Sequence, residues 1–412
     1  MSPKSENDEN DIDRREFLNR ASTMSVTGLS LAGLAGSFTA EEVYADSSET
    51  MEADMKDVTF DDLLEIRKGG DGLTMGSGPS HIGEVSSVEE WEIKADALRD
   101  IFRQTLGRAP DQDCPIDAEV IEEIDNGDHI RRTIAYNLAP DERINGYLLL
   151  PKKLKGKTPA VLCIHQTTPF GKEQVVGTDK SEVGRTLSYA LHLVRMGFIT
   201  FAYDLLTANE RKYEGLRDFD TGPFYEKFPE WSIRGKDLWD VGKALDVLET
   251  IDEVDASRIG SIGHSQGGGI TIHAMALEPR IIAGVSSCGD WPARLSKNPF
   301  NHARTGWWVG RPFLRPYCYT GKQFPIDLHE YLALAAPRSI MPINALNDFA
   351  YSLEETPLTR PEMGAMAGSV SKIFDLYDAG SNFQQILHEE KHSFSDGQRD
   401  TAYAFLKNKL QL

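Results

Sequence analysis

Cysteine is scarce in this chain, with four residues among 412, at positions 114, 163, 288 and 318. No two of them have the close spacing of a zinc or iron–sulfur site, and their density is far below that of a disulfide-stabilised domain. We therefore expect no metal and no cofactor. Cys163 falls in an apolar stretch and is expected in the core. The sequence leaves open whether Cys288 and Cys318 form a disulfide.

Basic residues are outnumbered, because 44 lysines and arginines stand against 64 aspartates and glutamates, a formal net charge of −20. Such a chain repels nucleic acid and anionic membrane surfaces, so neither is expected as a partner. The content of 40% hydrophobic and 26% charged residues is ordinary for a globular protein, and a sizeable core is expected. Composition leaves the oligomeric state open.

A long hydrophobic run is missing near the N-terminus. The apolar stretch at 24–35 is too short and too rich in Ser, Thr and Gly to anchor stably in a bilayer. It follows Arg14-Arg15-Glu16-Phe17-Leu18, which resembles the twin-arginine export signal, and it precedes small residues suited to cleavage at 43–45. We expect 1–45 to be a signal peptide that directs export to the periplasm or the medium. The alternative is an acidic tail with a chance arginine pair.

Regular patterns begin after residue 86. Helical periodicity starts at the capping residue Ser87 and stops at Gly107, so 46–115 is expected to be an N-terminal extension with one helix. Apolar strands then alternate with helices, which predicts an α/β domain over 116–412 with a mostly parallel sheet covered on both faces. The expected strands are 130–137, 144–150, 159–164, 198–203, 259–262, 281–287, 339–345 and 383–387. The expected helices are 88–102, 181–196, 233–251, 267–277, 363–376 and 399–410.

Residues 263–267 read Gly-His-Ser-Gln-Gly and lie between a predicted strand and a predicted helix. They fit the G-x-S-x-G pattern, in which a serine is held on a sharp strand-to-helix turn and larger residues in place of the glycines would collide with both elements. The pattern therefore indicates Ser265 as a catalytic nucleophile. The alternative is a glycine-rich turn that merely exposes a serine.

A serine hydroxyl needs a base to remove its proton and a carboxylate to orient that base. After this kind of turn the chain order is Ser, acid, His. His388 and His392 both follow the last predicted strand, and we favour His392 because it lies in the loop before the final helix. Asp290 and Asp348 each follow a predicted strand, and we favour Asp348 as the acid on the expected order.

Several stretches together resemble the α/β-hydrolases related to dienelactone hydrolase and bacterial acetyl xylan esterases. The resemblance implies the α/β-hydrolase fold, with an N-terminal extension and a lid-like insertion, and hydrolysis of a carboxylic ester through an acyl-serine intermediate. It also implies an oxyanion hole made by backbone N–H groups of Gln266 and Thr167. The stretches that carry it are Tyr147–Pro151, Pro159–His165, Asp204, Glu210-Arg211, Val254–Gly267, Ala336-Pro337-Arg338, Asn347-Asp348 and His392-Ser393-Phe394.

Other functions fit parts of the sequence. A serine peptidase can use the same fold, although no large gating domain of the peptidase kind is visible. Residues 388–392 also match the H-E-x-x-H motif of zinc peptidases, which requires a helix and a third ligand. Here a strand is expected before His388, and the 20 residues after His392 contain neither His nor Glu. A binding protein without catalysis would be expected to lack a member of the triad, and none is missing.

The segment 289–325 has no clear periodicity and is expected to be an insertion over the catalytic serine. It holds eight aromatic and six basic residues against one acid, an unusual balance in an acidic chain. Flat rings suit sugars and guanidinium groups suit carboxylates, so a polysaccharide-derived ester that carries a uronic acid is one hypothesis for the substrate. The other is a lid whose aromatic residues pack onto the core. The candidate substrate-binding residues are Trp291, Arg304, Trp307, Trp308 and Arg311.

Overall fold

A computed structural model describes residues 85–154, 156–179, 186–293, 300–303, 308–320, 324–348 and 359–412. The expected signal peptide and most of the expected lead-in to the first helix lie outside these residues. No helix in the described ranges combines the length and the apolar character that crossing a bilayer requires.

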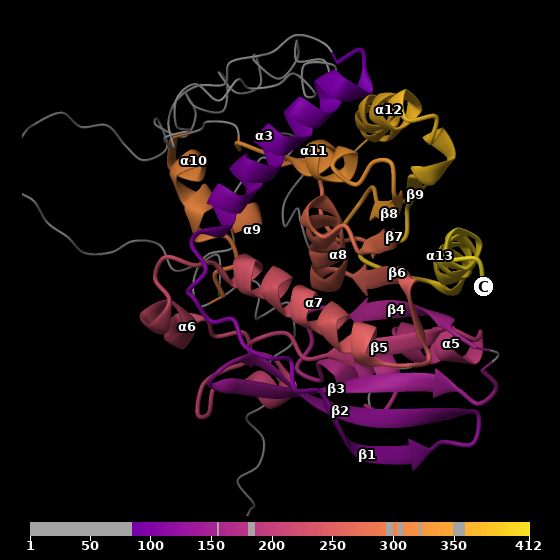
Figure 1. The fold of residues 1–412 in the computed structure, drawn as a ribbon. Coiled ribbons are helices and arrows are strands. Elements are labelled where there is room, and N and C mark those ends of the chain that lie inside the picture. Colours follow the sequence, from indigo (N-terminus) through magenta and orange to yellow (C-terminus); the bar gives the residue numbers. More distant parts are fainter. Residues whose placement is uncertain are drawn as a thin grey trace, which may run out of the picture. The chain divides into compact units, whose positions relative to one another are not determined.

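The centre of the described chain is one nine-stranded sheet in the order β1-β2-β3-β5-β4-β6-β7-β8-β9 (Figure 1). The pairs β1–β2, β2–β3 and β3–β5 are antiparallel, and the other five pairs are parallel. The predicted, mostly parallel sheet is therefore confirmed. The strands are β1 (Glu119–Asp125), β2 (His129–Ala139), β3 (Glu142–Pro151), β4 (Thr158–Ile164), β5 (Ile199–Tyr203), β6 (Val254–His264), β7 (Ile281–Ser287), β8 (Ser339–Ala345) and β9 (Ile386–His388).

Helices cover both faces of the sheet, as expected. The longer ones follow the predicted periodicity closely. Of the helix expected over 181–196, the first five residues lie outside the described ranges, and α5 begins at Tyr189, directly after Ser188, whose hydroxyl donates to the Gln174 carbonyl of α4. The helices are α3 (Val88–Leu106), α4 (Lys172–Val176), α5 (Tyr189–Arg195), α6 (Gly222–Lys227), α7 (Ile233–Thr250), α8 (Gln266–Leu277), α9 (Phe300–Ala303), α10 (Arg315–Thr320), α11 (Leu328–Ala333), α12 (Arg360–Leu376) and α13 (Asp396–Lys409).

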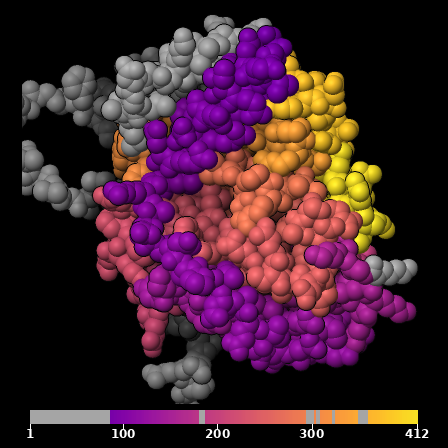
Figure 2. Space-filling model, viewed as in Figure 1, coloured from indigo at the N-terminus to yellow at the C-terminus, as the bar shows by residue number. Residues whose placement is uncertain are grey.

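Two hydrophobic cores hold these layers together. One lies between the sheet and α3, α7, α8, α11 and α12, and the other between the sheet and α4, α5 and α13. Figure 2 shows α3 as an indigo band on the surface of the first layer. Its Phe102 ring packs edge-on against Tyr331 of α11, with ring centroids 4.7 Å apart. The fully buried strands β4, β5 and β8 explain why these segments read as continuous apolar runs.

The carboxyl ends of the parallel strands meet along one edge of the sheet. β6 ends at His264, β7 at Ser287, β8 at Ala345 and β9 at His388. Ligands of open α/β sheets bind at this edge. Every residue predicted from the sequence to be catalytic lies on a loop or turn that leaves it.

Candidate active site

Ser265 is the single residue between β6 and α8, and its backbone is strained, with φ 55° and ψ −121°. The flanking glycines make this turn possible. A Cβ on Gly263 would lie 2.2 Å from the backbone carbon of Gly267, and a Cβ on Gly267 would lie 2.0 Å from the carbonyl oxygen of Ile164. The Ser265 N–H donates to the Ser287 carbonyl at 2.8 Å, which fixes the turn against β7.

A continuous hydrogen-bonded chain joins Ser265, His392 and Asp348. His392 Nε2 lies 2.8 Å from Ser265 Oγ, and His392 Nδ1 lies 2.7 Å from Asp348 Oδ2. The side chains of His392 and Asp348 are only 6% and 7% exposed. The structure thus brings together the three residues predicted as nucleophile, base and acid. In this arrangement Nδ1–H donates to the carboxylate, so that Nε2 is left to accept the serine proton.

The competing candidates lie elsewhere. His388 faces Cys288, with Nε2 3.8 Å from the sulfur, while its Nδ1 accepts the Glu390 N–H. Asp290 is buried and faces Arg311 at 3.6 Å and His302 at 3.5 Å. Burial alone would raise the pKa of Asp290, but Arg311 and His302 outweigh it and hold this pKa below its ordinary value.

Segment 388–392 is not helical. β9 ends at His388, and the following residues form bends up to His392. Glu389, the residue that would polarise water in a zinc peptidase, points to Arg360 and forms an exposed ion pair with it at 2.9 Å. The two histidines therefore do not share the helix face that the zinc motif requires.

Two neighbours of the triad had no signal in the sequence. Cys288 follows β7 with φ 47°, is 1% exposed, and its thiol donates to the Ser393 carbonyl at 3.5 Å. Burial raises the pKa of the Cys288 thiol, and the Asp348 carboxylate raises it further. The ring of His264 lies 4.9 Å from that of His392 and stacks on Phe394. These ring contacts pack His392 against the interior through His264.

A metal ion would find ligand atoms here. Cys288, Asp348 and His392 offer sulfur, oxygen and nitrogen atoms within 4.8 Å of one another. The same Asp348 and His392 atoms already form the hydrogen bond of the triad, so a metal would have to replace that bond. The four cysteines are all free thiols, and Cys288 and Cys318 are not paired.

The predicted oxyanion-hole residues lie side by side. Gln266 opens α8 directly after the serine, and Thr167 follows the end of β4. The Thr167 hydroxyl donates to the Gln266 side-chain oxygen at 3.3 Å. The close approach of Gly267 to Ile164 brings these two backbone segments together, since α8 begins against the end of β4.

Comparisons with known proteins bear on the fold and on the class of reaction. The family model for acetyl xylan esterase (AXE1) matches residues 118–289. The chain is 26% identical over 264 residues to YtaP of Bacillus subtilis (strain 168), which is named as a candidate hydrolase, and this match spans 62% of the chain and 82% of YtaP.

Solved structures share the fold. A glucuronoyl esterase from Solibacter usitatus superposes with a TM-score of 0.62 at 18% identity, covering 79% of this chain and 94% of the esterase. A candidate acetyl xylan esterase from Bacteroides fragilis gives 0.56 at 19% identity, covering 76% and 78%. The chain is an acetyl xylan esterase-like α/β-hydrolase. The hydrolase therefore has the predicted fold and belongs among enzymes that cleave esters.

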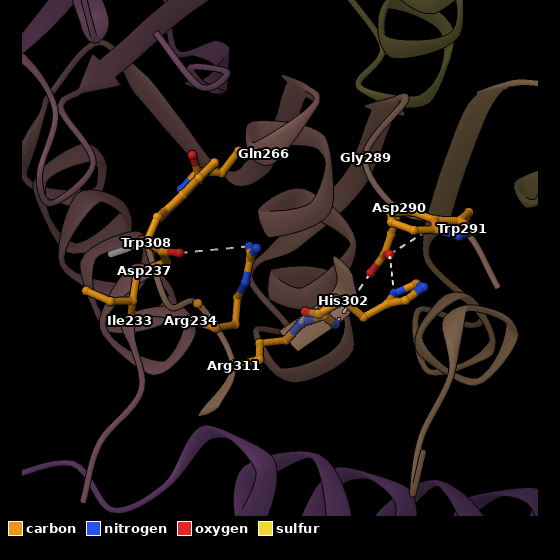
Figure 3. A pocket seen from close by; sticks show the side chains of 11 residues that line it. Ile233, Arg234, Asp237, Gln266, Gly289, Asp290, Trp291, His302, Trp308 and Arg311 are labelled. Carbon is orange, nitrogen blue, oxygen red and sulfur yellow. Dashed lines mark hydrogen bonds and ion pairs between the residues drawn. The ribbon is translucent and has the colours of Figure 1, made fainter. Parts of the chain in front are cut away.

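The hydrolase has a pocket beside its candidate nucleophile, with about 520 Å³ of empty space including the open mouth. Gln266, from the elbow, is part of its lining, and the insertion contributes Trp291, Trp308 and Arg311 (Figure 3). Arg304 and Trp307, the other two residues predicted to bind substrate, lie outside the described residues. The full lining is Ile233, Arg234, Asp237, Gln266, Gly289, Asp290, Trp291, His302, Trp308, Gly310 and Arg311.

Part of the pocket wall is held by its own contacts. The Arg311 Nε donates to the His302 carbonyl at 2.8 Å, and its Nη1 pairs with Asp290. The Trp291 ring lies 4.0 Å from the His302 ring, and Trp291 is 7% exposed. In the hydrolase these residues therefore stabilise the insertion around Asp290, the acid that the sequence offered as the rival to Asp348.

Arg234 and Asp237 line the same pocket from the first turn of α7 and were not foreseen. Their closest charged atoms, Nη1 and Oδ2, are 3.9 Å apart. Arg234 Nε and Nη1 and Asp237 Oδ1 are buried without a hydrogen-bond partner among the described residues. Burial raises the pKa of Asp237 to about 7, against the opposing effect of Arg234. The sequence showed only that both residues lie on a predicted helix.

Proposed function

We propose that this hydrolase is a serine esterase for a carbohydrate ester, with Ser265 as nucleophile, His392 as general base and Asp348 as the acid that orients it. The observation that carries the proposal is the hydrogen-bonded chain of 2.8 and 2.7 Å from Ser265 through His392 to Asp348. Its order along the sequence, Ser, Asp, His, is the one that follows a nucleophile elbow in this fold.

The chemistry is acyl transfer to water in two halves. Ser265 Oγ attacks the ester carbonyl carbon while His392 Nε2 takes the hydroxyl proton, and the same proton then passes to the departing alcohol. Water next attacks the acyl-serine, His392 takes one of its protons, and the acid leaves as that proton returns to Ser265. The N–H groups of Gln266 and Thr167 donate to the negative oxygen in both halves, and one such donor typically lowers the barrier by about 3 kcal/mol.

The carbohydrate part of the proposal has two supports. The family model is that of acetyl xylan esterase, and the solved structures with this fold include a glucuronoyl esterase. The pocket beside Gln266 is lined by Trp291 and Trp308 together with several polar side chains. Aromatic faces and buried polar groups are together suited to a sugar ring.

The domain organisation and the export route belong to the same proposal. Residues 1–45 would act as the twin-arginine signal, 46–115 as an extension, and 116–412 as the catalytic domain with its insertion at 289–325. An exported enzyme would meet polysaccharide outside the cytoplasm. Replacing both Arg14 and Arg15 by Lys is expected to retain precursor in the cytoplasm, as fractionation and immunoblotting would show, and unchanged export would contradict this route.

A substrate panel tests the function. Wild type and Ser265→Ala are compared on 4-nitrophenyl acetate, acetylated xylo-oligosaccharides, an alkyl ester of glucuronic acid and a 4-nitroanilide. We expect the wild type to cleave the aryl ester and at least one sugar ester but not the anilide, and Ser265→Ala to cleave none. Ser257→Ala, which alters an exposed serine at the start of β6, is the matched control and should retain wild-type rates. Anilide turnover without sugar-ester turnover would favour a peptidase.

A further inference from the structure

Arg234 and Asp237 line the same pocket as Gln266, and both have side-chain atoms without a hydrogen-bond partner among the described residues. The Arg234 N–H donates to the Gly310 carbonyl at 3.1 Å, so the first turn of α7 is fixed against the insertion. Three side-chain atoms, Arg234 Nε and Nη1 and Asp237 Oδ1, have no partner among the described residues. Buried polar groups of proteins are normally hydrogen-bonded, and exceptions in a pocket point to a ligand or to ordered water.

These atoms offer two donors and one acceptor within a small space. Figure 3 shows the two side chains, which both come from α7, pointing toward each other. A sugar hydroxyl is both donor and acceptor, so one hydroxyl can donate to Asp237 Oδ1 while a neighbouring oxygen accepts from Arg234 Nε or Nη1. Trp308 lines the same pocket, and its ring rests on Phe219 with centroids 5.2 Å apart. A supported indole face of this kind is suited to a sugar ring.

The charges in the pocket argue against a free carboxylate as the ligand. Arg234 lies beside Asp237, and Arg311 is paired with Asp290, so each of the two arginines already has a carboxyl group within 4 Å. The Arg311 fork is also occupied by the His302 carbonyl. A uronate bound at Arg234 would place its negative charge beside the Asp237 carboxyl group and raise the pKa of Asp237 further, so its binding would require uptake of a proton as well. Hydroxyl groups have no such cost.

We propose that Arg234 and Asp237 form a subsite that binds adjacent hydroxyl groups of a neutral sugar, and that this subsite selects neutral over acidic carbohydrate esters. The inference rests on the proposed carbohydrate esterase function. It adds which residues bind the sugar and that this sugar is uncharged. It replaces the uronic acid hypothesis that the basic composition of 289–325 suggests.

The experiment compares Arg234→Lys and Asp237→Asn with wild type on acetylated xylobiose and on 4-nitrophenyl acetate. Each variant is expected to lower the ratio of kcat/KM for the sugar ester to that for the aryl ester by about tenfold, mainly through KM, which is the loss expected for one or two hydrogen bonds to a charged group. The matched control is Arg195→Lys with Asp128→Asn. Arg195, at the end of α5, and Asp128, in the turn between β1 and β2, form an exposed pair at 2.7 Å, and the control should leave the ratio at its wild-type value.

A binding measurement covers the case in which a variant is inactive or unstable. Xylobiose is titrated calorimetrically into Ser265→Ala and into Ser265→Ala with Arg234→Lys, alongside a glucuronic acid disaccharide. The subsite predicts tighter binding of xylobiose than of the acidic sugar, and weaker xylobiose binding by the double variant. Preference for the acidic sugar, or equal binding by both proteins, would overturn it.

The outcomes separate the subsite from the function on which it rests. An unchanged substrate ratio in both variants, with sugar esters cleaved by wild type, overturns the subsite alone. Cleavage of aryl esters without any sugar ester contradicts the carbohydrate function and the subsite together. Loss of all activity in Ser265→Ala, with ratio changes in the α7 variants, supports both.

Discussion

Nδ1 of His392 lies 2.7 Å from Oδ2 of Asp348, and both side chains are almost fully buried. The buried Cys288 sulfur lies within 4.8 Å of the ligand atoms of both residues, and its thiol donates to the Ser393 carbonyl at 3.5 Å. A buried carboxylate that is hydrogen-bonded to Nδ1 keeps the imidazole in one tautomer and one orientation, as general-base catalysis by a triad requires.

The first prediction concerns this carboxylate. Asp348→Asn should lower kcat by about 10⁴-fold, because an amide favours the wrong histidine tautomer without changing the shape of the site. Asp290→Asn is the matched comparison, since Asp290 is the other acid at a strand end. Its loss should be much smaller in kcat and should appear mainly as a lower Tm, because Arg311 loses its buried partner. A greater loss of kcat in Asp290→Asn than in Asp348→Asn would instead indicate Asp290 as the acid of the triad.

The second prediction separates a general base from a zinc ligand. His392→Ala should lower kcat by about 10³-fold or more, whereas His388→Ala and Glu389→Gln should retain most activity, since neither contacts Ser265. Dialysis against a chelator should leave the rates unchanged. Activity that is lost with the chelator and restored by zinc would contradict the proposed mechanism.

The third prediction tests the elbow. Gly267→Ala places a Cβ 2.0 Å from the Ile164 carbonyl oxygen, so the turn must shift. A displacement of this kind should cost about 100-fold in kcat/KM, and overpacking should lower the free energy of unfolding by about 1–3 kcal/mol. Gly368→Ala, on the exposed side of α12 with open space around it, should instead stabilise the protein by about 0.5–1 kcal/mol. Equal effects of the two changes in urea unfolding would argue against a strained turn.

Features that depend on neighbouring residues could be predicted from the sequence, whereas features that depend on contacts between distant segments could not. The elbow at 263–267 and the strand 159–164 are determined by neighbouring residues, and both were predicted correctly. Of the helix expected over 181–196, the described part begins at Tyr189, after Ser188, which bonds to Gln174 in another element. Periodicity cannot register such a tertiary contact. The short helices α9 and α10 inside the insertion have too few turns to show a period.

The site shows the same limit. Motif order and strand ends favoured His392 over His388 and Asp348 over Asp290, and the structure places the favoured pair in one hydrogen-bonded chain with Ser265. Arg234 and Asp237 carry no motif, and on a helical pattern they read as polar positions of α7. They line the pocket where α7 packs against the insertion at Gly310, and a helical pattern does not reveal such a tertiary contact. The composition of 289–325 suggested free arginines, yet Arg311 is held by Asp290 and by the His302 carbonyl.

The fourth prediction concerns pH. Burial raises the pKa of Asp237 to about 7, and it therefore keeps its proton in the folded protein over a range where the unfolded chain has lost it. The free energy of unfolding contributed by this group should fall as pH rises from about 4 to about 7, and level off above that. The Asp237→Asn variant should lack this decrease in the free energy of unfolding. The charged groups that act on Asp237 are Arg234, Asp240, Arg211 and Lys236.

Urea unfolding at pH 5, 6, 7 and 8 measures this effect. The stability of Asp237→Asn relative to wild type should increase between pH 5 and 7 and then stay constant. Asp128→Asn provides a flat control over this range, because His129 and Arg195 lower the pKa of Asp128 and its contribution to stability changes only below about pH 4. A pH-independent difference for Asp237→Asn would show that Asp237 is ionised throughout.

The most direct test of the account is the site of covalent labelling. Wild-type protein is treated with a fluorophosphonate and digested, and the modified peptide is mapped by mass spectrometry, with His392→Ala and Ser257→Ala treated in parallel. A triad predicts one phosphonyl group on Ser265, no loss of labelling in Ser257→Ala, and labelling slowed by about 10³-fold in His392→Ala, since the hydroxyl then lacks its base. Modification of a different residue, or equal labelling of His392→Ala and wild type, would contradict the account.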